Sequence, residues 1–132
     1  MKLLVPELGS EVVRAAAAES QALAASRLVY IETRGVLGRL RVDTRGRSHD
    51  VDAALRLFER YWPEIGVTEL DEAVARTAAD IAERLLIRGA DAVHLASALQ
   101  VHGQHEAMLF ATWDVRLATA AASEGLTTLP AR

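Results

Sequence analysis

Short apolar segments alternate with amphipathic helical patterns along this chain, and this alternation constrains the fold more than any other feature. Apolar runs typical of strands occupy residues 28–31, 66–70, 108–112 and 127–129. Helical patterns occupy residues 11–23, 32–40, 48–62, 71–85, 90–101 and 115–123. Parallel strands need crossover connections, which are usually helices, so this order predicts an α/β domain with a mainly parallel sheet. The 132 residues suit a single domain spanning residues 1–132.

Individual residues mark the expected ends of these helices. Ser10 and Ser48 are predicted N-caps, because a serine hydroxyl can accept a hydrogen bond from the free N–H groups of a first turn. Asp71 is expected to open the helix that follows the second strand. Pro63 should end the helix before that strand, since proline lacks the N–H that a helix interior requires. Gly125 fits a helix C-cap.

The composition limits the possible classes of protein. Half of the residues (51%) are hydrophobic, so a folded globule is expected. The absence of cysteine excludes disulfides and thiolate chemistry, and it fits a cytoplasmic protein. No apolar run approaches the roughly 20 residues that a membrane helix needs. The net charge of −3 excludes a strongly basic protein, which is the usual form of a nucleic-acid binder.

Basic residues nevertheless gather in one stretch between residues 33 and 48. Five arginines lie there against one acid, Asp43. A local basic patch on an acidic protein is suited to phosphate contacts. A solvated helix end and loop is the alternative reading. The arginines are Arg34, Arg39, Arg41, Arg45 and Arg47.

Three acids stand where an α/β sheet places its functional groups. Glu32 and Asp114 each follow a predicted strand, and Asp91 opens a predicted helix. Sites in such sheets lie beyond the carboxyl ends of the strands, so the pattern directs three carboxylates toward one edge. Converging carboxylates bind Mg²⁺ through oxygen, and the ion can orient a water and neutralise charge on a phosphodiester. Each acid also has a purely structural reading, as a first-turn helix acid or, for Asp114, as an N-cap.

The segments around these acids resemble the motifs of PIN-domain ribonucleases, in particular the VapC toxins of bacterial toxin–antitoxin pairs. The resemblance extends in order over nearly the whole chain. Its specific parts are Tyr-Ile-Glu-Thr-Arg at residues 30–34, Arg-Gly-Ala-Asp-Ala-Val-His-Leu-Ala at residues 88–96, and Ala-Thr-Trp-Asp-Val-Arg-Leu at residues 111–117. It implies a three-layer α/β/α domain.

By this resemblance Glu32, Asp91 and Asp114 are catalytic acids that ligate Mg²⁺ or Mn²⁺. Thr112 is implied to position the last acid or a metal-bound water. Arg34, Arg39 and Arg88 are candidate RNA contacts, with a helix-end cation as the alternative role of Arg88. His94 is read as a packed or hydrogen-bonded helix residue, with a catalytic base as the alternative.

The implied function is a metal-dependent endoribonuclease, the toxin of a type II toxin–antitoxin system. The implied partners are a VapB-like antitoxin whose C-terminal segment covers the acidic pocket, an RNA substrate and a second copy of the toxin. No membrane association is expected. A carboxylate-based phosphatase is a further alternative, but it needs an Asp nucleophile early in the chain, which is absent.

The chain departs from the family pattern at its start. In the family a further Asp lies on the first, central strand, ahead of a stretch like residues 2–7, and Met1 falls inside that stretch. The strand near Val29 is therefore expected to lack its neighbour toward the strand near Phe110. An upstream start codon, a strand from another chain, or closure of the remaining strands would each resolve the gap. Since one acidic ligand is missing, the alternative function is a catalytically weak or inactive PIN domain that binds antitoxin or RNA without cleavage.

Overall fold

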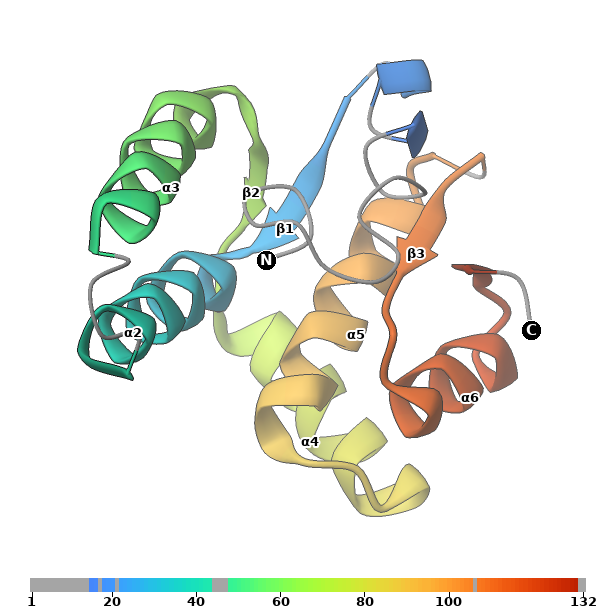
Figure 1. Cartoon of the computed structure of the whole chain (residues 1–132). Helices are drawn as coiled ribbons and strands as arrows, with labels where there is room; N and C mark the ends of the chain where they lie inside the picture. Colours follow the sequence, from blue (N-terminus) through green and yellow to red (C-terminus); the bar gives the residue numbers. More distant parts are fainter. Residues whose placement is uncertain (1–14, 17, 21, 44–47, 106, 131–132) are drawn as a thin grey trace. The chain divides into compact units, whose positions relative to one another are not determined.

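The computed structural model describes residues 15–16, 18–20, 22–43, 48–105 and 107–130 (Figure 1). These described residues divide into two compact units: unit 1 holds those up to Leu23 and those within Val29–Gly66, and unit 2 holds Ala24–Leu28 and those from Val67 onward. Ser10 and residues 11–14, 17 and 21 of the predicted helix over residues 11–23 lie outside the described residues. Residues 15–16 and 18–19 are helical, whereas Ala22 and Leu23 are not. The elements in chain order are β1 (Ala24–Ser26), α2 (Arg27–Asp43), α3 (Ser48–Tyr61), the 3₁₀ turn η1 (Trp62–Glu64), β2 (Gly66–Thr68), α4 (Glu72–Leu85), α5 (Gly89–His102), β3 (Leu109–Ala111), α6 (Val115–Ser123) and β4 (Thr127–Leu129).

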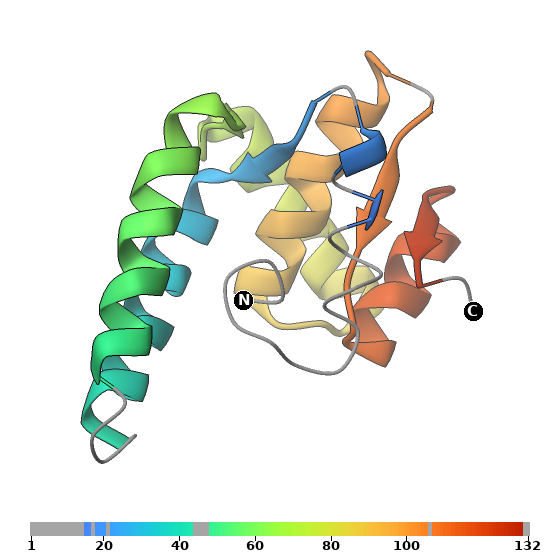
Figure 2. The same ribbon diagram turned by 45° about the horizontal axis from the view of Figure 1, so that its top comes forward.

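Unit 1 is built on helices α2 and α3, which lie side by side (Figure 2). Their contact buries Leu37 of α2 against Val51 and Ala54 of α3. Phe58 of α3 is buried as well, so the buried face of α3 has helical spacing and the predicted helix over residues 48–62 is confirmed. The helix ends at Tyr61, and Pro63 follows in the 3₁₀ turn η1, as its missing N–H requires.

An aromatic cluster closes one end of this helix pair. The ring centroid of Tyr30 lies 5.6 Å from that of Phe58 and 5.2 Å from that of Trp62. Phe58 and Trp62 are themselves 5.4 Å apart. All three pairs are tilted, and their centroid distances fall within the range that aromatic pairs prefer. The cluster therefore fixes the first turns of α2 against the end of α3.

The predicted strand over residues 28–31 is wrong, because these residues lie in α2. The observed strand β1 comes earlier, at Ala24–Ser26, and the hydroxyl of Ser26 accepts a hydrogen bond from the backbone N–H of Leu28 at 3.1 Å. A short apolar run cannot be assigned to strand or helix from its pattern alone. In the helical conformation Tyr30 packs against Phe58 and Trp62, about thirty positions away, and such distant contacts leave no mark on the local pattern. Glu32 consequently lies in the second turn of a helix rather than at a strand end.

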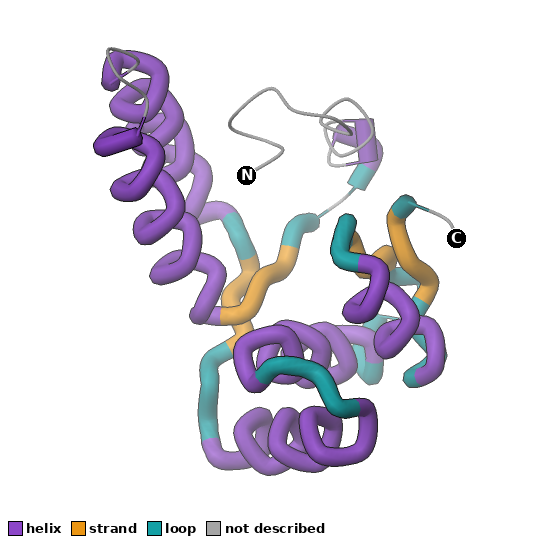
Figure 3. Tube along the Cα trace, turned by 60° about the horizontal axis from the view of Figure 1, so that its bottom comes forward, coloured by secondary structure: helices purple, strands orange, loops and turns teal. Residues whose placement is uncertain are grey.

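Unit 2 is organised around α4 and α5, which pack along each other (Figure 3). Asp71 begins α4 as predicted, since its carboxylate accepts a hydrogen bond from the backbone N–H of Val74 at 2.9 Å. Ile81 and Leu95 are the largest fully buried side chains. The buried core of this unit comprises Val74, Ala78, Ile81, Ala92, Leu95, Ala96, Leu117, Ala120, Ala121 and Leu126.

The strands of the described chain form two separate two-stranded sheets. β1 pairs with β2, and β3 pairs with β4. The β3–β4 pairing is parallel, with Phe110 opposite Thr128, and α6 is the helical crossover that connects them. This confirms the predicted parallel strand pairing at the C-terminal end. Within the described residues, no hydrogen-bonded pairing joins β1 to β3, so the strands have not closed up into one sheet.

The turn after α6 shows why glycine stands at residue 125. The backbone there adopts φ +89°, in the left-handed region that side chains other than glycine rarely occupy. Glu124 is the C-cap of α6, and the Gly125 N–H donates to the carbonyl of Ala122 at 3.0 Å. The predicted glycine stop is therefore confirmed, one position beyond the cap residue itself. Among the described residues, no helix combines the length and apolar character that a membrane span needs.

Candidate functional site

Asp91 lies in the first turn of α5, where it is half-buried. The helix starts after Arg88, whose backbone is extended and whose side chain caps no N–H of the first turn. The cap residue therefore provides no side-chain acceptor for the first N–H groups of α5, which carry the partial positive charge of the helix dipole. A carboxylate in this first turn is stabilised by the helix dipole. The sequence placed Asp91 at a helix start, and this placement is confirmed.

Asp114 is the N-cap of α6. Its carboxylate accepts a hydrogen bond from the backbone N–H of Leu117 at 2.9 Å, which is the usual N-cap geometry. The backbone N–H of Asp114 donates in turn to the hydroxyl of Thr112 at 3.2 Å. Thr112 thereby fixes the short connection between β3 and α6, and Asp114 remains exposed to solvent.

The N-terminal ends of α5 and α6 lie at the same end of unit 2 (Figure 1). Arg116, in the first turn of α6, donates from Nη2 to the carbonyl of Leu86 at 3.4 Å. Leu86 ends α4 in the left-handed conformation, with φ 54° and ψ 41°. The segment from Leu86 to Arg88 leads directly into α5. Arg116 therefore links the helix start that carries Asp114 to the segment that precedes Asp91.

Glu32 belongs to unit 1, whereas Asp91, Asp114 and Thr112 belong to unit 2. The Glu32 side chain is exposed on α2. Within the described ranges, no three His, Asp or Glu side chains form a group that could hold a metal ion. The structure thus brings two of the predicted acids and Thr112 into one compact unit. A metal site that includes all three acids stays a prediction.

The three candidate RNA-contacting arginines differ in their surroundings. Arg34 donates from Nη1 to Glu59 at 2.5 Å and to the Tyr30 hydroxyl at 3.1 Å, and its guanidinium lies 5.8 Å from the Tyr30 ring centroid. The hydrogen bond to Glu59 raises the pKa of Arg34 above its usual value. Arg39 and Arg88 are exposed. A phosphate would therefore meet Arg39 or Arg88 directly, but would compete with Glu59 for Arg34.

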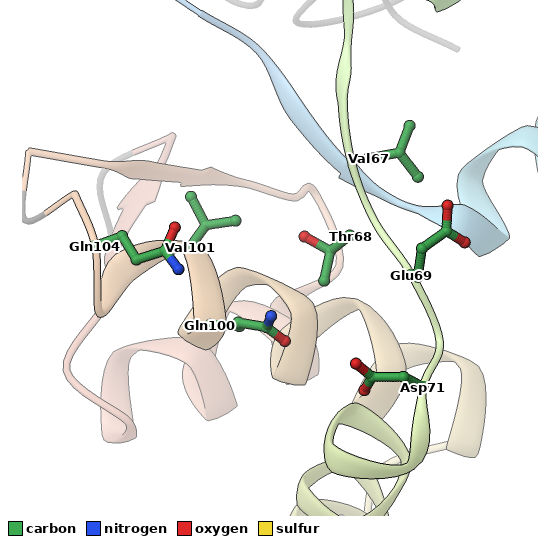
Figure 4. Close-up of a pocket in the computed structure, with 7 residues that line it drawn as sticks. All are labelled: Val67, Thr68, Glu69, Asp71, Gln100, Val101 and Gln104. Carbon is green, nitrogen blue, oxygen red and sulfur yellow. The ribbon is translucent and has the colours of Figure 1, made fainter.

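A pocket that the sequence did not reveal lies elsewhere in unit 2 (Figure 4). It has a volume of about 350 Å³ and lies between the end of β2 with the segment that follows it and the C-terminal end of α5 with the turn that follows it. None of the predicted site residues lines it. The one available sign was the pair of glutamines four positions apart, Gln100 in the last turn of α5 and Gln104 just after the end of that helix. The lining residues are Val67, Thr68, Glu69, Asp71, Gln100, Val101 and Gln104.

Comparison with known proteins gives matches over nearly the full length of the chain. The family model described as PIN domain matches residues 2–122. Ribonuclease VapC45 of Mycobacterium tuberculosis (strain CDC 1551 / Oshkosh) is 36% identical over 137 aligned positions, which cover 100% of this chain and 90% of that protein. Ribonuclease VapC49 of Mycobacterium tuberculosis (strain ATCC 25618 / H37Rv) matches with the same identity and coverage.

Proposed function

The chain belongs to the PIN-domain family, and we propose that it is a metal-dependent endoribonuclease of the VapC type, the toxin of a toxin–antitoxin pair. The observation that carries this proposal is the 36% identity to two proteins named as VapC ribonucleases, which extends over the whole chain. The placement of Asp91 and Asp114 at two helix starts of the same unit supports it.

The proposed ligands of the metal ion are Asp91, Asp114 and Glu32. Carboxylate oxygens are the ligands that Mg²⁺ and Mn²⁺ prefer, so the donor set fits either ion. The cap of α6 uses one oxygen of Asp114, Oδ1, and the other oxygen remains for a second partner. When bound, such an ion orients a water and neutralises negative charge that develops on a phosphodiester. The role of Glu32 rests on the resemblance of residues 30–34 to the family motif.

The surrounding side chains have supporting roles in this proposal. Thr112 holds the backbone N–H of Asp114, and so keeps that carboxylate at the start of α6. Arg88 is exposed beside the first turn of α5, where its planar guanidinium can make a bidentate contact with an RNA phosphate. Arg39 and Arg34 would contribute further phosphate contacts, and each such contact makes RNA binding weaker at higher salt.

RNA as the substrate and a VapB-like antitoxin are proposed as partners because both relatives are named VapC ribonucleases. A homodimer is proposed from the family resemblance alone. A cytoplasmic location is part of the same proposal, since toxin, antitoxin and RNA would meet there.

A second candidate function is a PIN domain that binds antitoxin or RNA without cleavage. The observation that favours it is that no three-acid group forms among the residues described. A protein of this kind would still bind antitoxin or RNA but would not cleave RNA.

RNA cleavage by the purified chain in Mg²⁺ or Mn²⁺ tests these two functions. Asp91→Asn and Asp114→Asn should each abolish cleavage, whereas Asp50→Asn should not. Asp50 is a matched control, because it is likewise an acid in the first turn of a helix, α3. Cleavage that persists in both site variants would contradict the proposed ligands. Absence of cleavage in the unmodified chain, together with retained RNA binding, would favour the second function.

A further inference from the structure

The pocket beside the C-terminal part of α5 is lined by polar side chains that come from two directions (Figure 4). Thr68 at the end of β2 and Asp71 at the start of α4 face it from one side, and Gln100 in the last turn of α5 and Gln104 just after that helix face it from the other. Val101 adds apolar surface. Because Asp91 lies in the first turn of α5 and the pocket lies near its other end, the two are separated along the helix.

The polar groups of this pocket have unused hydrogen-bonding capacity. The structure gives Thr68 Oγ1 and the carboxamides of Gln100 and Gln104 no hydrogen-bond partner among the residues it describes. Each carboxamide can accept through its oxygen and donate through its nitrogen. Asp71 uses Oδ1 for the N-cap of α4, so its second oxygen is available to a ligand.

The charge in the pocket is negative and is only partly compensated. Arg27 donates two hydrogen bonds to Glu69, and these lower the pKa of that carboxyl. Within the described part of the chain, Asp71 has no basic partner, and no cation lines the pocket. A ligand with one positive charge would therefore restore balance without displacing Arg27.

We infer that this pocket binds the guanidinium group of an arginine side chain carried by a protein partner. A guanidinium presents five N–H donors in one plane, which suits acceptors that approach from two sides. Asp71, Gln100 and Thr68 offer those acceptors, and the methylene stem of the arginine would pass over Val101. The volume of about 350 Å³ accommodates the whole side chain. A nucleotide is disfavoured, because its phosphate would approach two carboxylates.

Titration with a short capped peptide tests this site. Acetyl-Gly-Arg-Gly-amide is added to the full chain while amide NMR spectra are recorded, and the shifts should concentrate at residues 67–71 and 100–104. One guanidinium with a few contacts should bind with a dissociation constant of about 1 mM. The same peptide with citrulline, which has the shape of arginine without its charge, should bind at least about tenfold more weakly, since charge-assisted hydrogen bonds are about twice as strong as neutral ones.

Substitutions assign the site. Asp71→Asn keeps an N-cap residue for α4 but removes the charge, so it should weaken arginine-peptide binding about tenfold without loss of folding. Gln100→Ala should weaken binding several-fold. Glu83→Gln is the matched control, since Glu83 is an exposed acid on α4 outside the pocket, and it should change nothing.

Three outcomes would overturn the inference. They are equal binding of the arginine and citrulline peptides, unchanged binding by Asp71→Asn, and shifts of the same amides on addition of adenosine monophosphate in place of the peptide. The last result would assign the pocket to RNA. The test measures no cleavage, so its result is independent of whether the chain is a nuclease.

Discussion

The carboxylate of Asp114 accepts a hydrogen bond from the backbone N–H of Leu117 at 2.9 Å. The same carboxylate is a proposed metal ligand, so one side chain has both a structural and a chemical role. Asparagine caps helices about as well as aspartate but carries no charge. Substitution at this position can therefore separate the two roles.

Asp114→Asn should leave the stability of the fold nearly unchanged and remove metal-dependent RNA cleavage. Asp114→Ala should in addition lower the free energy of unfolding by about 1 kcal/mol, because the cap is lost. Urea unfolding monitored by circular dichroism, together with Mn²⁺ titration of each variant, measures both effects. Equal loss of stability in the two variants would show that the negative charge, rather than the capping hydrogen bond, stabilises α6.

Tyr30→Phe should destabilise the chain by about 0.5–1.5 kcal/mol, the usual net value of a hydrogen bond. The Tyr30 hydroxyl donates to Glu59 at 2.7 Å and accepts from Arg34 at 3.1 Å, and phenylalanine keeps the ring contacts while removing both bonds. Tyr61→Phe is the control, since Tyr61 is 52% exposed and its hydroxyl has no described partner. Thermal melts of the two variants should differ, and identical melts would mean that the Tyr30 hydroxyl contributes no net stability.

Ile81→Ala should lower the free energy of unfolding by roughly 2–5 kcal/mol, because a large buried side chain is replaced by a cavity. Ile81 is 1% exposed in the core of unit 2. Val115→Ala, at a site 60% exposed on α6, should change stability by less than about 0.5 kcal/mol. Urea midpoints of the two variants provide the comparison. A cost of Ile81→Ala as small as that of Val115→Ala would contradict the assigned core.

Glu69 should contribute to stability in a pH-dependent way. The hydrogen bond from Arg27 lowers the pKa of Glu69 in the folded state from its usual value of 4.5. The stabilisation is therefore fully present above the usual pKa, and it is lost as the pH falls through the lowered pKa. Melting temperatures of the unmodified chain and of Glu69→Gln should differ slightly near neutral pH and converge in acid. Added salt should reduce the difference, because both side chains are exposed. A difference in melting temperature that grows as the pH falls would contradict the stabilising role of the Glu69 carboxylate.

The helices of unit 2 could be predicted from sequence because several independent signals agree there. Asp71 marks the start of α4, Val74 and Ile81 mark its buried face, and Gly125 marks the turn after α6. Capping residues and helical periodicity depend on residues close together in the chain, so both can be recognised from one amino-acid sequence. The parallel pairing of β3 with β4 follows from the helix between them.

The start of α2 could not be predicted in this way. Residues 28–31 are apolar and β-branched enough to suit a strand, whereas in the helix Tyr30 packs against Phe58 and Trp62. Such contacts join distant parts of the chain and leave no local pattern. The candidate site shows the same limit. The sequence located Asp91 and Asp114 at helix starts, but the hydrogen bond from Arg116 to Leu86 joins residues thirty positions apart and has no local sign.

The cap formed by Asp114 bears on how a chain of this family can change its role. One base change converts an aspartate codon into an asparagine codon, and asparagine at this position would still start α6. Loss of turnover would then carry no folding defect, and the altered protein would escape the degradation that removes misfolded chains. A toxin gene could thereby become the gene for a stable competitor that occupies antitoxin or RNA in place of its active relatives.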